Sequence, residues 1–188
     1  GRLSSVLDIR MKEGNSKEFA GEASIGVIAS KLTLEAPIVK DKGSIMISGR
    51  RTYLDLILRA SSNEDLQDTQ LYFYDINAKA NYRINDKNRI FLSGYFGRDV
   101  FGFEDTFGFD WGNATATFRW NHLFSDRLFS NTSLIYSNYD YSVSIIDGDE
   151  ENQVTSAIQD VNFKQDFDYF LGNNSTLKFG GNLIYHTF

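Results

Sequence analysis

The chain has 188 residues, enough for one domain, and its net charge of -6 with a pI near 4.9 argues against a nucleic-acid partner, because phosphate binding needs a basic surface. The absence of Cys excludes disulfides, thiolate metal sites and cysteine nucleophiles. A mean hydropathy of -0.34 and the lack of any run of about 18 apolar residues exclude a transmembrane helix. Transmembrane strands escape that test, because polar residues dilute their apolar ones.

The first predicted elements are short strands joined by turns. Apolar residues over 3–11 predict a strand that ends at the polar stretch 13–16. The segment 19–36 is compatible with one long strand or with a tight hairpin near 25–28, and its internal glycines favour the hairpin, because such glycines mark bends. A charged turn follows at 40–43, and 45–58 is predicted as the next strand.

The stretch 71–84 has the clearest pattern in the chain. Successive side chains of a strand point to opposite faces, so the stretch has one polar and one apolar face. One face carries Asp75, Asn77, Lys79, Asn81 and Arg83, and the other carries Tyr72, Tyr74, Ile76, Ala78, Ala80, Tyr82 and Ile84. On a strand tilted by about 40°, Tyr74 and Tyr82 differ in height by roughly 20 Å, close to the apolar band between the aromatic girdles of an outer-membrane barrel.

Later strands repeat this alternation over 89–99, 110–124, 128–144, 154–171 and from 177 onward. The strand 110–124 has Gly112, Ala114, Ala116, Phe118 and Trp120 on one face and Asn113, Thr115, Thr117, Arg119 and Asn121 on the other. The strand 154–171 has Val161, Phe163, Phe167 and Tyr169 outward and Asp160, Asn162, Lys164, Asp166 and Asp168 inward. Short polar turns near 41, 86, 126 and 173 alternate with longer loops expected at 60–70, 100–109 and 147–152. Bacterial barrels show such an asymmetry of short periplasmic turns and long extracellular loops.

These patterns predict an all-β protein, an antiparallel transmembrane β-barrel in the outer membrane of a Gram-negative bacterium. The alternative is a soluble β-sandwich or solenoid. Sandwich strands average about 5 to 6 residues, whereas several predicted strands are much longer. In a sandwich, Ile76, Ala80, Phe118 and Phe163 would pack against a second sheet of the same molecule.

Four segments carry a resemblance to a known family. Residues 1–15 (GRLSSVLDIRMKEGN) resemble the end of the plug domain of TonB-dependent outer-membrane transporters of the Bacteroidetes type. Residues 31–38 (KLTLEAPI) and 48–55 (SGRRTYLD) resemble the first strands of their barrel, and 90–99 (IFLSGYFGRD) resembles a later strand.

The resemblance implies a 22-stranded barrel closed around a plug. Residues 1–16 would be the C-terminal end of the plug and 17–188 the first part of the barrel, with about nine strands. The rest of the plug, the TonB box and the remaining strands would lie outside this chain. The implied function is to bind a scarce solute at the cell surface and import it into the periplasm. The implied partners are outer-membrane lipid, the TonB system, the small solute or nutrient and a surface lipoprotein; siderophore, oligosaccharide, peptide and cobalamin all stay open as substrates.

Three other interpretations remain open from the sequence. The barrel is a scaffold for surface lipoproteins or a larger complex, or the chain is a soluble β-domain for surface adhesion. A closed eight-stranded barrel is compatible with the length, because such barrels need about 9 to 11 residues per strand. Against it, the opening segment has no place in a small closed barrel.

No catalytic, cofactor or metal residue is predicted, and the chain is not expected to be an enzyme. The acidic stretch 147–152 offers oxygen ligands for Ca²⁺ but lacks EF-hand spacing, so a solvated loop is the simpler interpretation. His122 and His186 belong to no metal motif. Asp160 with Asp166 or Asp168 superficially suggests a glycosidase pair, but in a hydrated interior neither acid would be buried.

The inward charges are expected to serve solute passage, to hold a plug, or simply to face water. They are Asp75, Lys79, Arg83, Asp160, Lys164, Asp166 and Asp168. Arg50 and Arg51, which precede the predicted outer loop, are expected either to meet carboxylates of the plug or simply to face water.

Overall fold

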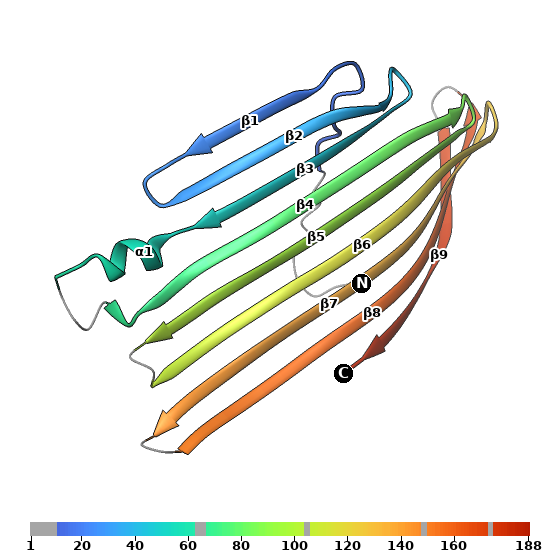
Figure 1. Ribbon diagram of the computed structural model, residues 1–188. Coiled ribbons are helices and arrows are strands. Elements are labelled where there is room, and N and C mark those ends of the chain that lie inside the picture. Colours follow the sequence, from blue (N-terminus) through green and yellow to red (C-terminus); the bar gives the residue numbers. More distant parts are fainter. Residues whose placement is uncertain (1–10, 63–66, 104–105, 148–149, 173–174) are drawn as a thin grey trace.

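The computed structural model describes residues 11–62, 67–103, 106–147, 150–172 and 175–188. These residues form one antiparallel sheet of nine strands in sequence order, seen as a single curved layer in Figure 1. The strands are β1 Ala20–Ile25, β2 Ala29–Val39, β3 Gly43–Thr52, β4 Gln70–Asn85, β5 Asn88–Phe103, β6 Phe107–Ser125, β7 Leu128–Asp147, β8 Glu150–Gly172 and β9 Ser175–Thr187. The predicted all-β class and antiparallel pairing are confirmed.

Hairpins join the strands, as the turn residues predict. The hairpin between β1 and β2 is closed by a bond from the Gly26 amide to the Ala29 carbonyl, 2.9 Å, which confirms the predicted bend. Asp41, between β2 and β3, has a positive φ of 61°, a conformation that Asp tolerates better than most residues. Asn85 accepts a hydrogen bond from the Lys87 amide at 3.0 Å, an Asx-turn between β4 and β5.

The prediction of long loops at 100–109 and 147–152 is wrong. The segment 100–109 is mostly strand, with Phe103 paired to Phe107, and 147–152 is also mostly strand, with Asp147 paired to Glu150. The alternating pattern continues through both segments, and the aromatic and β-branched residues near them favour strands. The connection between β3 and β4 is long and includes residues 60–69 of the predicted 60–70 loop, whereas Gln70 already begins β4.

The predicted strand 45–58 ends early, at Thr52, and helix α1, Leu54–Arg59, occupies the rest. Its sequence, LDLILR, has good helix formers and lacks the polar–apolar alternation of the other strands. Asp55 in the first turn and Arg59 in the last turn interact favourably with the helix dipole and so stabilise α1. Arg51 also forms an ion pair with Asp55 at 3.3 Å. α1 is the only helix among the described residues, none of which form a helix long and apolar enough to span a membrane.

The sheet is open and single. β1 and β9 are its two edges, and the described residues contain neither pairing between them nor a second sheet. The closed eight-stranded barrel and the two-sheet sandwich are therefore not formed by the described part of the chain. β4 to β8 have 16 to 23 residues each, long for a soluble sheet.

Candidate functional site

One face of the sheet, which we call the apolar face, carries Ile76 and its neighbours. Directly paired residues of adjacent strands point to the same face, so the register follows this face across the sheet. One continuous row consists of Ala36, Ile45, Ala80, Leu92, Phe118, Leu134, Phe163 and Leu183. Eight neighbouring strands thus place an apolar residue at the same level of one surface.

The apolar face is open to its surroundings. Ile76 is 51% exposed, Phe118 43% and Phe163 48%, while Ala80 is half-buried. The packing against a second sheet that a sandwich requires is therefore absent from the described residues. Water-soluble monomers rarely expose contiguous apolar patches larger than a few hundred Å², and larger patches mark contact with a partner or a membrane.

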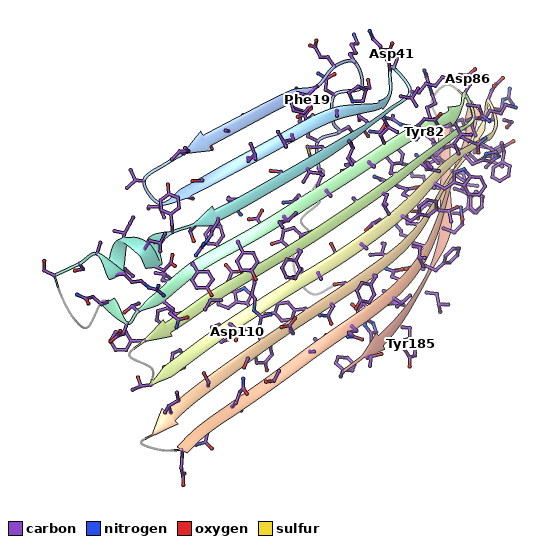
Figure 2. All side chains as sticks on the ribbon, in the orientation of Figure 1. Phe19, Asp41, Tyr82, Asp86, Asp110 and Tyr185 are labelled. Carbon is purple, nitrogen blue, oxygen red and sulfur yellow. The ribbon has the colours of Figure 1, made fainter. Side chains whose placement is uncertain are left out.

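Aromatic side chains border the apolar face at the end of the sheet that carries the short turns, such as the turn between β4 and β5. Figure 2 shows rings crowded at this end of the sheet, where Tyr82 is labelled. Ring centroids lie 5.3 Å apart for Trp120 and His122, 4.3 Å for His122 and Phe124, 6.5 Å for Phe124 and Phe167, and 5.1 Å for Phe167 and Phe179. These contacts form an aromatic belt that crosses β6, β8 and β9.

At the other end, the apolar face gives way to charge. The rings of Tyr74 and Phe96 lie 6.1 Å apart, and beyond them Arg98 forms ion pairs with Asp110 and, at 3.4 Å, with Asp140. By register all three charged residues share the apolar face. The apolar face is therefore a band between an aromatic belt and a charged cluster.

The opposite face, the polar face, is lined by Ser, Thr, Asn and charged residues. Asp75, Lys79 and Asn81 are 7%, 7% and 5% exposed, much less than the side chains of the apolar face. Asn81 donates to the Ser44 hydroxyl at 2.7 Å, and the Thr33 and Ser48 hydroxyls lie 2.9 Å apart. The usual preference for apolar burial is thus inverted in this sheet.

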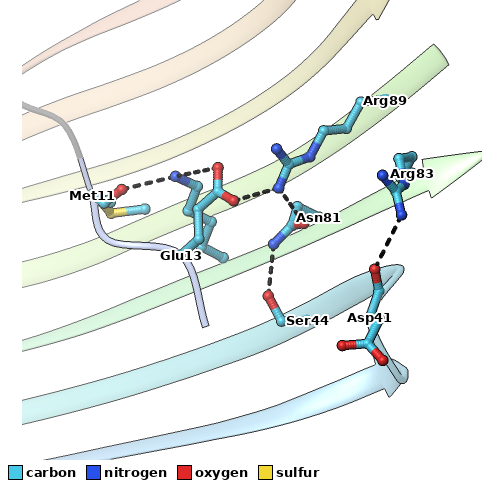
Figure 3. A network of polar contacts seen from close by, with 8 residues as sticks. Met11, Glu13, Asp41, Ser44, Asn81, Arg83 and Arg89 are labelled. Atoms are coloured by element: carbon cyan, nitrogen blue, oxygen red, sulfur yellow. Dashed lines mark hydrogen bonds and ion pairs between the residues drawn. The ribbon is translucent and has the colours of Figure 1, made fainter. Parts of the chain in front are cut away.

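Residues 11–16, here named the N-terminal segment, lie across the polar face. Lys79 Nζ donates to the Met11 carbonyl at 2.8 Å and lies 3.9 Å from the Glu13 carboxylate (Figure 3). Arg89 donates to the other Glu13 oxygen and to Asn81 Oδ1, the latter at 2.8 Å. Two cations from β4 and β5 therefore hold one carboxylate of the segment.

Further contacts hold both sides of the N-terminal segment. Lys12 Nζ lies 2.8 Å from Glu35 on β2, and this hydrogen bond and the charge of Glu35 raise the pKa of Lys12. A Cβ at Gly14 would lie only 2.5 Å from the Ile45 carbonyl oxygen, so the close approach requires glycine. The Asp41 amide donates to the Ser16 carbonyl at 2.9 Å.

Arg50 and Arg51 make no ion pair with residues 11–16, and their predicted contact with carboxylates of a plug stays a prediction. Arg50 pairs with Asp75 at 2.7 Å and Arg51 with Asp55 at 3.3 Å, both within the sheet and helix. The carboxylate of the N-terminal segment is held instead by Lys79, one of the predicted inward charges, and by Arg89, which the sequence did not single out. Arg83 donates to the Asp41 carbonyl at 3.4 Å.

The predicted inward charges of β8 do share the polar face, and each carboxylate has a basic partner. Asp160 lies 2.6 Å from His186 Nδ1, Asp166 lies 2.9 Å from Lys164, and Asp168 lies 3.5 Å from Lys178. The contacts of Asp160 with His186 and of Asp168 with Lys178 link β8 to β9, whereas Lys164 and Asp166 pair within β8. They do not resemble the combination of a buried acid and a free carboxylate that glycoside hydrolysis needs.

The acidic stretch 147–152 and the two histidines are the residues that the sequence offers for metal binding. Residues 148–149 of the acidic stretch lie outside the described residues, while 150–152 belong to β8. His122 has its Nδ1 2.7 Å from Asn88 Oδ1 and lies within the aromatic belt. The described residues contain no group of three or more His, Asp or Glu placed to hold a metal ion.

Comparison with known protein families, with curated proteins and with solved structures finds no match for this chain. The functional argument therefore depends on the geometry of the two faces and of the N-terminal segment.

Proposed function

We propose that this chain is part of a β-barrel transporter of the outer membrane, resembling the TonB-dependent type. The observation that carries the proposal is the inversion of the sheet: an exposed apolar band on one face and a buried polar network on the other. Lipid covers the apolar band in this proposal, and its aromatic belt lies at the interface, where tyrosine and tryptophan rings are favoured.

The open edges support the same proposal. No water inside a bilayer can satisfy the free backbone groups of β1 and β9, so spanning strands must belong to a closed sheet. We therefore place further strands of the whole protein between these two edges. The polar face then surrounds a hydrated interior.

The N-terminal segment is the second support. It lies on the polar face and is held there by Lys79, Arg89 and Glu35, so that it would be inside the closed barrel. In this proposal the segment connects to a plug that fills the interior. Its contacts are hydrogen bonds and ion pairs, which water can replace if the plug rearranges during import.

Site-directed spin labelling tests the orientation of the faces. The chain has no cysteine, so Phe118→Cys and its neighbour Thr117→Cys each give one labelling site in the chain, on opposite faces of β6. We expect the label at 118 to collide with oxygen dissolved in lipid and the label at 117 to collide with a water-soluble nickel complex. Equal access of the nickel complex to both labels in lipid vesicles would contradict membrane insertion.

Solute uptake by intact cells tests the transport role. We expect deletion of the gene to abolish accumulation of one labelled solute among siderophores, oligosaccharides, peptides and cobalamin, and loss of TonB to have the same effect. Uptake that is unchanged by both deletions, together with surface lipoproteins retained on the detergent-purified protein, would instead establish the scaffold role.

A further inference from the structure

The structure contains a cleft where β3 leaves the sheet. It has a volume of about 250 Å³. Its lining includes Tyr72, Phe73, Asp99 and Trp111, with the aliphatic side chains of Ile28 and Leu54. In Figure 1, α1 lies beside the beginning of β4 at this end of the sheet, and the two elements are in contact. The cleft is thus walled by rings and aliphatic side chains, with one carboxylate.

That carboxylate lies between two aromatic residues. The register pairs Phe73 with Asp99 and Asp99 with Trp111, so the three side chains share the polar face on adjacent strands. Directly opposed side chains on neighbouring strands are about 5 Å apart at Cβ. Within the part of the chain that the structure describes, Asp99 makes no hydrogen bond and no ion pair.

The charges around the cleft sum to one negative charge. Arg50 pairs with Asp75 at 2.7 Å, and its charge also acts on Asp99. Arg51 pairs with Asp55 at 3.3 Å. Two guanidinium groups thus face three carboxylates, and the carboxylate without an ion pair of its own is Asp99.

The rings of the cleft already bind cations from within the chain. The Arg50 guanidinium lies 4.8 Å from the centroid of Phe73, and the Arg51 guanidinium lies 5.5 Å from that of Tyr72. Aromatic faces attract cations electrostatically, most strongly where water is excluded. An apolar wall, ring faces and one free carboxylate together select a ligand that is both positively charged and largely apolar.

We propose that this cleft binds a small organic cation, an alkylammonium group with a short aliphatic tail. Asp99 supplies the counter-charge, and Phe73 and Trp111 supply ring faces beside it. The volume admits a small ligand only, since pockets for drug-sized molecules start at about 300 Å³. The inference is independent of the membrane proposal, because it depends only on the lining of the cleft and on the charges beside it.

Calorimetric titration of the full chain in detergent micelles with choline tests the proposal. The control ligand is 3,3-dimethylbutan-1-ol, which has the same shape without the charge. We expect saturable choline binding that is about tenfold tighter than binding of the alcohol, a difference that a partly desolvated cation–aromatic and charge contact can supply. Absence of saturable choline binding, or equal affinity for both ligands, would overturn the proposal.

Variants separate the charge from the rings. We expect Asp99→Asn to reduce choline affinity about tenfold and leave affinity for the alcohol unchanged, whereas Asp86→Asn, the same change at a distant turn, has no effect. Phe73→Leu keeps the carboxylate and removes one ring, so it should also lower the affinity for choline and leave the affinity for the alcohol unchanged. This variant tests the site if Asp99→Asn does not fold. Choline affinity unchanged by Phe73→Leu and by any folded Asp99→Asn contradicts the site. The spin-label result on β6 can succeed or fail independently of either outcome.

Discussion

Replacement of Leu134 by Arg is expected to lower the free energy of unfolding by about 2 to 4 kcal/mol in lipid vesicles, the cost of a cation on the lipid face near the bilayer midplane. Leu134 is 51% exposed and lies in the apolar row between Phe118 and Phe163. On a water-exposed surface the same substitution would change stability by about 0.5 kcal/mol or less. Denaturant unfolding of the full chain from vesicles measures the difference.

The matched control is Ser137→Arg, three residues along the same strand. Ser137 pairs with Thr115 and Asp160, so it lies on the polar face, where a new cation meets a carboxylate. We expect little loss of stability there. Equal effects of the two substitutions would mean that water and not lipid covers the apolar face.

Loss of the Lys79 ammonium is expected to release the N-terminal segment. Lys79→Met keeps the length of the side chain but removes its bond to the Met11 carbonyl and its attraction to Glu13. Leaving such buried groups unpaired costs about 1 to 3 kcal/mol. Trypsin should therefore cleave after Lys12 and Lys17 roughly tenfold or more faster, because local opening controls access.

A pair of neutral substitutions separates this contact from general destabilisation. Glu13→Gln and Arg89→Gln each remove one partner of the same ion pair and add no trypsin site within the segment. We expect the double variant to be cleaved no faster than the faster single variant, and Lys87→Met in an exposed turn to leave cleavage unchanged. Cleavage at the parent rate in Lys79→Met would show that other contacts hold the segment.

The sequence predicted the two faces of the sheet well, because the alternation of side chains is a local property of a strand. The faces of 71–84, 110–124 and 154–171 are all confirmed by the register. Composition was a poorer guide to strand ends. Glycine and phenylalanine between 100 and 109 indicated a loop, yet these residues pair across a narrow hairpin, where Gly102 faces Gly108.

The contacts of the N-terminal segment could not be derived from the sequence. Glu13 and Arg89 are 76 positions apart, and no periodicity relates a segment lying across a sheet to the strands beneath it. The sequence favoured Arg50 and Arg51 because they precede the predicted outer loop. It could not show that Asp75 and Asp55 already neutralise them.

Because each strand pairs only with those before and after it in the chain, the sheet can grow one hairpin at a time. No strand of the sheet pairs with a segment that is distant in the sequence, so the entropic cost of loop closure is small at each step. A gain or loss of one whole hairpin would widen or narrow the sheet while leaving every other pair of strands intact. Evolution can therefore adjust the number of strands in such a sheet by duplicating short stretches of its gene.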